Sequence, residues 1–243
     1  MRALLIAFTF LTRIPFPQPQ NVTTEEFTRS QRYYPLIGLF LGGILWSTAA
    51  LAGIFYPPLA VAAIVLALEI ILTGGLHLDG FMDSMDGLLS ARTPERMLAI
   101  MKDSRVGAHA SITLAVLLIL KFSLIASFDP RSYYFLVLPP MLARWAFLIA
   151  VIHFPYARKE GLGKGFHESG RWVFFVAEGM ILALLVYWIY GLAGISAILS
   201  ALALVTLFSW RVARLLGGLT GDIYGAIIEI TEVVVLLVIV AYL

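Results

Sequence analysis

Residues 74–107 read GGLHLDGFMDSMDGLLSARTPERMLAIMKDSRVG and contain four of the six aspartates of the chain. Three of these, Asp79, Asp83 and Asp86, are spaced at i, i+4 and i+7. Residues at this spacing lie on one face of an α-helix. The sequence therefore predicts a helix that presents three carboxylates side by side.

Three neighbouring carboxylates repel one another unless a positive group joins them. The chain has no cysteine, and a set of oxygen ligands favours a hard divalent cation such as Mg²⁺ or Mn²⁺. We expect Asp79, Asp83 and Asp86 to hold Mg²⁺, and Asp83 and Asp86 to be central to catalysis. His77 is the best candidate among the four histidines for a chemical role. The alternative is that the three acids form a solvated face of a loop.

Basic residues follow the acids, at Arg92, Lys102 and Arg105. Protein-bound Mg²⁺ commonly bridges carboxylates to the phosphates of a substrate, so we expect these three side chains to bind phosphate. Thr93 and Pro94 lie between Arg92 and Lys102. Thr93 is suited to cap a helix, and Pro94 is suited to the first helical position. A second short helix is therefore predicted directly after the acidic one.

The composition is that of a membrane protein. With 60% hydrophobic and 13% charged residues and a mean hydropathy of +0.92, the 243-residue chain is too apolar for an ordinary soluble domain. The net charge of +2 is too small to indicate a nucleic-acid partner. The absence of cysteine excludes a disulfide framework and a thiolate metal site. We expect the protein to be surrounded by membrane lipids and to bind no nucleic acid.

Apolar segments long enough to cross the hydrocarbon recur along the chain. They are expected near residues 34–56, 59–76, 109–128, 132–153, 171–190, 194–210 and 223–243. The predicted fold is an all-α, polytopic bundle of about seven transmembrane helices, forming a single membrane-embedded catalytic domain over residues 1–243. Residues 1–11 lack a following small-residue cleavage site, so they are interpreted as a retained interfacial segment.

Lysine and arginine are unequally distributed between the connections. If every span crosses once, residues 92–105, residues 158–171 and the pair Arg211 and Arg214 share the side of the N-terminus, whereas the opposite side holds only Arg131. Positive residues are retained on the cytoplasmic side. The N-terminus and the aspartate cluster are therefore expected at the cytoplasmic face.

Six charged residues fall inside the predicted spans, where charges are costly and usually face the bundle interior or a cavity. They are Glu69, Lys121, Arg144, Glu178, Glu229 and Glu232. At 1.5 Å per residue, Arg144 reaches a depth similar to that of Glu229 and Glu232. We predict that Arg144 pairs with one of these glutamates, which places the fourth and seventh spans side by side. Arg144 is also a candidate for substrate binding.

Two further segments lie on the same predicted face. The loop YARKEGLGKGF, residues 156–166, mixes glycines with Arg158 and Lys164. Glycines let backbone N–H groups approach an anion, although a flexible connection explains the same pattern. The segment GGLTGDIYGAIIEITE, residues 217–232, places Asp222 at the start of the last helix. Asp222 is expected to complete the metal site or to orient an acceptor.

Six segments in order resemble the cobalamin synthase family of adenosylcobinamide-GDP ribazoletransferases. They are FLTRIPFP at 10–17, YPLIGLFLG at 34–42, TGGLHLDGFMDSMDGLLSAR at 73–92, RMLAIMKDSRVGAHA at 96–110, YARKEGLG at 156–163 and GGLTGDIYGAIIE at 217–229. The resemblance covers nearly the whole chain. The chain departs from the family pattern at Met82 and Met85, where small residues are more common, but neither position carries a metal role.

The resemblance implies a Mg²⁺-dependent transfer of phosphocobinamide from adenosylcobinamide-GDP to α-ribazole or its 5′-phosphate, with release of GMP, in the bacterial inner membrane. It implies that Asp103 is a further metal ligand or orients the acceptor hydroxyl, that Arg92, Lys102 and Arg105 hold phosphates, and that Arg158 and Lys164 hold the GMP portion. A large amphipathic corrinoid requires an open site, which leaves room for a homo-oligomer or a complex with other cobalamin-assembly enzymes.

Three other functions fit part of the pattern. Asp83, Asp86, Gly87, Ala91 and Arg92 echo, with one extra residue, the DxxDGxxAR signature of CDP-alcohol phosphotransferases, which perform the same class of chemistry on lipids. An intramembrane prenyltransferase would need a second aspartate-rich motif, and residues 217–232 supply only Asp222. An ion-coupled transporter is disfavoured because the charges gather at one face and no inverted repeat is visible.

Overall fold

The computed structural model describes residues 1–158 and 171–243, whose regular structure is helical apart from one isolated β-bridge. The α-helices are α1 Arg2–Leu11, α2 Thr24–Ser30, α3 Tyr34–Ala52, α4 Pro58–Thr73, α5 Leu76–Leu88, α6 Pro94–Ile100, α7 Ala108–Ala126, α8 Leu138–His153, α9 Arg171–Leu216 and α10 Gly221–Val240. Two 3₁₀ turns, η1 Gln31–Tyr33 and η2 Tyr133–Val137, lead into α3 and α8.

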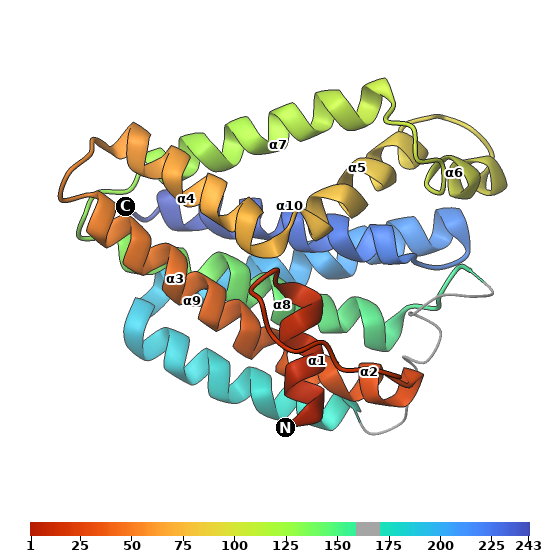
Figure 1. The fold of residues 1–243 in the computed structure, drawn as a ribbon, viewed down its shortest axis with the longest axis horizontal. Helices are drawn as coiled ribbons and strands as arrows, with labels where there is room; N and C mark the ends of the chain where they lie inside the picture. Colours follow the sequence, from red (N-terminus) through yellow and green to blue (C-terminus); the bar gives the residue numbers. More distant parts are fainter. Residues whose placement is uncertain (159–170) are drawn as a thin grey trace.

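Helices α8 and α10 form the centre of the bundle. Every residue of α8 from Leu138 to Val151 is buried, and α10 is buried along most of its length. The surrounding helices α3, α4, α7 and α9 expose large apolar side chains such as Trp188 and Leu184. The long helices run along one common direction (Figure 1). Apolar side chains on the outside are expected where lipid tails are the solvent, so this is the architecture of a membrane protein.

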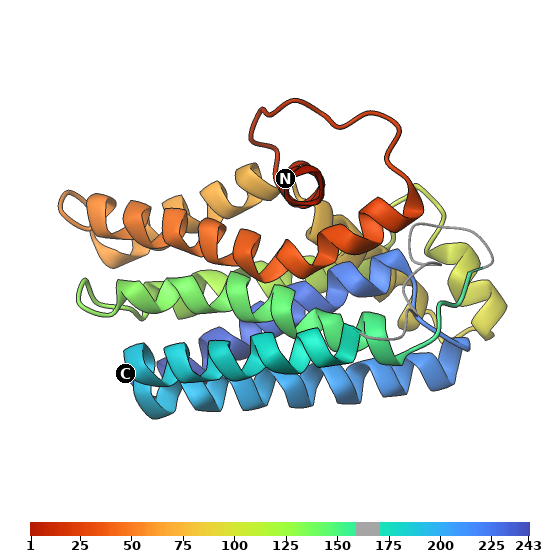
Figure 2. The same cartoon turned by 90° about the horizontal axis from the view of Figure 1, so that it is seen from below.

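The helix count agrees with the expected seven or so spans. Five described helical stretches are long and apolar enough to cross a membrane, and the bent pair α4 and α5 makes a sixth. The longest, 42 residues, would extend roughly 63 Å as one straight helix, about twice the hydrocarbon thickness. Gly191, with φ of 59° and ψ of −141°, divides α9 into two helices. Figure 2 shows these two arms running back along each other, so each can cross once.

Helix α1 lies across the bundle rather than along it, and Figure 2 views it end-on. Its Ile6, Ala7 and Leu11 are buried. The backbone N–H of Arg13, just after the helix, donates to the carbonyl of Leu72 at 2.7 Å. The N-terminal segment is therefore a packed, non-crossing part of the fold, in agreement with the expected interfacial segment.

The connections predicted to be rich in basic residues gather at one end of the bundle. Helix α6, the end of α8 and the turn between α9 and α10 lie at this end, and the C-terminus lies at the other (Figures 1 and 2). Asp129 and Arg131 precede η2 at the C-terminal end. The arrangement follows from apolar helices that each cross the bundle in turn, and it brings the acidic helix, Arg158 and Asp222 to the same end.

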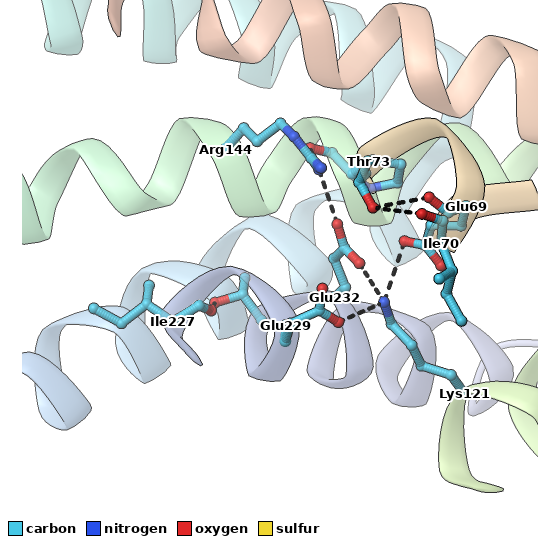
Figure 3. A network of polar contacts seen from close by, with 10 residues as sticks. Glu69, Ile70, Thr73, Lys121, Arg144, Ile227, Glu229 and Glu232 are labelled. Atoms are coloured by element: carbon cyan, nitrogen blue, oxygen red, sulfur yellow. Dashed lines mark hydrogen bonds and ion pairs between the residues drawn. The ribbon is translucent and has the colours of Figure 1, made fainter. Parts of the chain in front are cut away.

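Five charged side chains, four of them buried and Glu69 half-buried, meet between α4, α7, α8 and α10 (Figure 3). Lys121 Nζ lies 3.1 Å from Glu69 Oε1 and 2.9 Å from Glu229 Oε2, and it also pairs with Glu232. Arg144 Nη1 lies 2.8 Å from Glu232 Oε1 and donates to the carbonyl of Pro140 at 3.0 Å. The predicted pairing of Arg144 with a glutamate of the last span is thus confirmed. Removing one member of such a network leaves the other charges without a partner and without access to water, which is strongly unfavourable.

Replacing Lys121 with Met should lower the free energy of unfolding by roughly 3–5 kcal/mol, because Glu69 and Glu229 would lose their described cation and Glu232 would keep Arg144 alone among the described residues. Lys102→Met, which changes an exposed lysine in the same way, is the matched control and should unfold like the unchanged protein. Thermal unfolding in detergent micelles measures both variants. Equal stability of the two variants would contradict the importance of the network.

Candidate active site

Two successive glycines separate α4 from the acidic helix α5. Gly74 and Gly75 have φ of +64° and +68°, a left-handed backbone that side chains disfavour. They end α4 and turn the chain by 90° into α5. A Cβ atom at Gly74 would lie 2.4 Å from Cγ of Arg13, so glycine also makes room for the N-terminal segment. The expected span at 59–76 therefore ends in a break rather than in a straight exit from the membrane.

The three predicted aspartates lie on α5, as their spacing predicts. Asp79 is exposed, and Asp83 and Asp86 are half-buried. The Asp83 carboxylate is repelled by those of Asp222, Asp79 and Asp86. Neither Asp79 nor Asp83 accepts a hydrogen bond from any residue that the structure describes. Within the part of the chain that the structure describes, these two carboxylates are therefore the members of the cluster with free oxygen atoms.

Asp86 has a structural contact that its sequence position does not reveal. Its Oδ2 accepts the N–H of Gly107 at 2.6 Å and its Oδ1 accepts the N–H of Ala110 at 2.8 Å. These donors belong to the first turn of α7, whose N–H groups have no partner within their own helix. A carboxylate there also interacts favourably with the helix dipole. Asp86 therefore fixes the start of α7 against α5.

Helices α5 and α10 cross in backbone contact beside the aspartates. A Cβ at Gly80 would lie 2.9 Å from the carbonyl oxygen of Asp222, and one at Gly225 would lie 3.0 Å from that of His77. Small residues allow such close helix crossings in membranes. The crossing brings Asp222, as predicted, beside the acidic cluster, although the sequence gives no direct sign that Gly80 is the point of contact.

Asp222 is held by a cation from a connection before α9. Arg158 Nη2 lies 2.6 Å from Asp222 Oδ2, and the hydroxyl of Thr220 lies 3.3 Å from the same atom. The chain around Arg158 is fixed by two backbone hydrogen bonds, from Ala157 N–H to Leu219 O and from Leu219 N–H to Pro155 O, both 2.8 Å. Both side chains were candidates from the sequence, but their pairing across 64 residues was not foreseen.

The remaining sequence candidates occupy different surroundings. Arg92 and Lys102 are exposed beside α6, and α6 begins, as predicted, after Thr93, whose side chain makes no capping hydrogen bond. Arg144 lies in the buried ion network, only 1% exposed, so its substrate-binding role stays a prediction without a described contact. Lys164 lies outside the described residues.

Asp103 and Arg105 pair with each other on the connection between α6 and α7. Arg105 Nη2 lies 2.6 Å from Asp103 Oδ2, and the Arg105 N–H donates to Asp103 Oδ1 at 3.1 Å. Hydrogen bonds from this arginine lower the pKa of the Asp103 carboxyl to about 2. Arg105 is exposed and Asp103 is half-buried. The connection that carries them, between α6 and α7, lies at the same end of the bundle as α6 (Figure 1).

A cavity of about 300 Å³ adjoins the crossing of α5 and α10. His77, Asp79, Gly80 and Asp222 line one part of it. His77 is buried, with 5% of its surface exposed. Within the described residues, no three acidic or histidine side chains are close enough to enclose a metal ion by themselves. Any ion held by Asp79 and Asp83 would therefore need further oxygen ligands from elsewhere.

Fold and site together define a polytopic helical membrane protein with carboxylates and arginines gathered at one end of its bundle. The family model described as cobalamin-5-phosphate synthase matches residues 3–240. The chain belongs to this family.

Curated relatives agree with the family assignment. An adenosylcobinamide-GDP ribazoletransferase of Desulfitobacterium hafniense is 57% identical over 98% of this chain and 96% of its own length. Proteins of the same name from Brevibacillus brevis and Pseudomonas aeruginosa are 40% and 42% identical, over 99% and 97% of this chain and 98% and 96% of their own lengths. No solved structure matches the chain. The phospholipid-type phosphotransferase and the transporter are not favoured.

Replacing Gly80 with Ala should separate α5 from α10, because the added Cβ would press against the backbone of Asp222. We expect a loss of roughly 1–3 kcal/mol in the free energy of unfolding, as for other overpacked sites. Gly43→Ala in α3, whose Cβ would meet nothing within 4 Å, is the control. If denaturation showed equal stabilities for both variants, the close crossing would be wrong.

Replacing Arg105 with Gln should raise the pKa of Asp103 from about 2 towards its ordinary value of 3.8. Because the pKa is lowered in the folded protein, the stabilising contribution of the pair is present above the ordinary value and is lost as the pH falls through about 2. Carboxyl ¹³C NMR follows the titration, with Arg92→Gln as the control. An unchanged Asp103 titration in Arg105→Gln would contradict the pairing.

Proposed function

We propose that this chain transfers phosphocobinamide from adenosylcobinamide-GDP to α-ribazole, or to its 5′-phosphate, and releases GMP. A ribose hydroxyl oxygen attacks the phosphorus that bears cobinamide, the bond from this phosphorus to the oxygen of the GMP phosphate breaks, and the hydroxyl proton leaves to a base. The observation that carries the proposal is the 57% identity over 98% of the chain, joined to free carboxylates beside arginines at one end of the bundle.

The donor set of α5 suits Mg²⁺. Asp79 and Asp83 offer carboxylate oxygens without described hydrogen bonds, and no cysteine competes as a soft ligand. Mg²⁺ is usually bound by one or two carboxylates together with substrate phosphates and water. This explains why the described side chains need not enclose the ion by themselves. When bound, the ion would neutralise charge on the pyrophosphate.

We assign different tasks to the four aspartates of the crossing. Asp79 and Asp83 would hold the metal together with the substrate. Asp86, whose two oxygens accept backbone N–H groups of α7, would position the helix and retain lone pairs for a metal-bound water. Asp222, oriented by Arg158 and Thr220, would accept a hydrogen bond from the attacking hydroxyl.

The basic residues at the same end are suited to the anionic substrate. Arg92, Lys102 and Arg105 are exposed on the connections before and after α6, the helix that follows the acidic one, where they can meet phosphate oxygens. Phosphoryl transfer depends mainly on positioning and on neutralising charge, so a protein nucleophile is not required. Arg158 is already beside Asp222 and would contact the GMP portion, whereas Asp103 would be freed from Arg105 when that arginine binds phosphate.

We further propose that the site end faces the cytoplasm from the bacterial inner membrane. The connections rich in lysine and arginine share this end, and such residues are retained on the cytoplasmic side. GDP-activated substrates are then accessible from the compartment where nucleotides are made.

Replacing Asp83 with Asn should abolish turnover while the protein still inserts in membranes, because one oxygen ligand and its charge are lost. GMP release from adenosylcobinamide-GDP measures turnover, and release should require both α-ribazole and Mg²⁺. Asp129→Asn, a matched change at the opposite end of the bundle, should leave the rate unchanged.

Full activity of Asp83→Asn would remove this residue from the metal site. Release of CMP from a CDP-activated lipid, in place of GMP release, would contradict the proposed function itself.

A further inference from the structure

Six aromatic rings form a continuous row through the interior beside the crossing. Ring centroids of Phe27 and Phe10 are 4.9 Å apart, and those of Phe10 and Tyr34 are 6.2 Å apart. From Tyr34 the row continues to Phe147 at 5.8 Å and from there to Tyr224 at 5.3 Å. It ends at Tyr156, 6.5 Å from Tyr224. The row joins residues from α1, α2, α3, α8 and α10 that are far apart in the sequence.

All six rings line the cavity of about 300 Å³ that also contains Asp79 and Asp222. Protein interiors are otherwise packed with few voids larger than a water molecule. Small-molecule sites typically begin at about this volume and are lined by apolar and aromatic groups with a few placed polar ones. The cavity therefore has the size and the lining of a ligand site, with two carboxylates and six aromatic rings in its wall.

The two substrates of the proposed reaction carry three ring systems that are candidates for this cavity: the corrin macrocycle, guanine and the benzimidazole base. The corrin macrocycle is much too large for this cavity. Guanine carries donors and acceptors along most of its edge. The lining has fewer polar side chains, Gln31, His77, Asp79 and Asp222, than aromatic and aliphatic ones, so part of that edge would be left without partners, which is costly. The benzimidazole base of α-ribazole is planar and largely apolar, so aromatic stacking satisfies most of its surface.

We propose that this cavity is the subsite for the benzimidazole base of α-ribazole. The inference rests on the proposed function and names the place of its acceptor substrate. The base lies against the aromatic row, and the ribose extends towards Asp222 and Asp79, where its hydroxyl meets the activated phosphorus. Buried His77, on the cavity wall, is near enough to this base to contact its polar edge.

This placement separates the two substrates on the protein. The base of the acceptor lies among α1, α2, α3, α8 and α10, whereas the pyrophosphate of the donor lies over the exposed face of α5 towards Arg92 and Lys102. The two substrates meet at the carboxylates of the crossing. The aromatic row would then also set base specificity, since planar apolar bases gain from stacking and polar bases such as adenine lose hydrogen bonds to water.

The test compares two buried phenylalanines near each other in the chain. Phe147→Leu removes a ring that lines the cavity, and Phe135→Leu removes a ring that does not. In steady-state GMP release, Phe147→Leu should raise KM for α-ribazole about tenfold, within the range expected for the loss of one stacking partner of a base. KM for adenosylcobinamide-GDP should stay unchanged. Phe135→Leu should leave both constants unchanged.

A second variant guards against a folding defect in the first. Leu76→Trp places a larger side chain at a partly exposed position of the cavity wall. Because it narrows the cavity, it should also raise KM for α-ribazole and leave KM for adenosylcobinamide-GDP unchanged. In the unchanged protein, 5,6-dimethylbenzimidazole should inhibit competitively with α-ribazole. An increase in KM for adenosylcobinamide-GDP instead would overturn the subsite and leave the reaction standing. No GMP release by the unchanged protein would overturn the proposed function, and the subsite with it.

Discussion

The site depends on the backbone contact between α5 and α10. Gly80 and Gly225 have no side chain to hold the helices apart, so the carboxylates of Asp83 and Asp222 come to lie near enough to repel each other. Asp222 is paired with Arg158, whereas Asp83 has no described hydrogen-bond partner, and an unpaired carboxylate is unfavourable within an apolar bundle. The fold accepts this repulsion at one end of the molecule, which is where a cation and an anionic substrate can relieve it.

The rest of the bundle holds this crossing in place. Further inside the bundle, Lys121 forms ion pairs with glutamates of α4 and α10, and Arg144 of α8 forms one with a glutamate of α10. Buried charges of this kind contribute less to stability than to fixing which helices meet, because any other arrangement would leave a charge unpaired. The break at Gly74 and Gly75 then redirects α5 over the network. The network and the break together set the angle at which α5 meets α10.

The face of α5 and the buried ion pair could be predicted from the sequence, because residue spacing within one helix and depth along a span can both be read from residue positions. Helical spacing places Asp79, Asp83 and Asp86 on one face, and depth along the spans pairs Arg144 with Glu229 or Glu232, of which the structure shows Glu232. Both were confirmed. The double-glycine break, the bonds from α7 to Asp86 and the pairing of Arg158 with Asp222 were not foreseen. The two glycines are a local signal for a turn, but the continuous apolar stretch 59–76 hides the break. The contacts of Asp86 and Asp222 join segments far apart in the chain, and periodicity carries no information on such contacts.

We propose that carboxylates at the crossing bind a divalent metal only together with the pyrophosphate of the donor. Electron paramagnetic resonance with Mn²⁺ in place of Mg²⁺, on the protein in lipid nanodiscs, measures this binding. The protein alone should bind Mn²⁺ weakly. Adenosylcobinamide-GDP should tighten this binding and introduce a ³¹P hyperfine coupling. Tight Mn²⁺ binding without substrate, or binding without phosphorus coupling when substrate is present, would contradict the account.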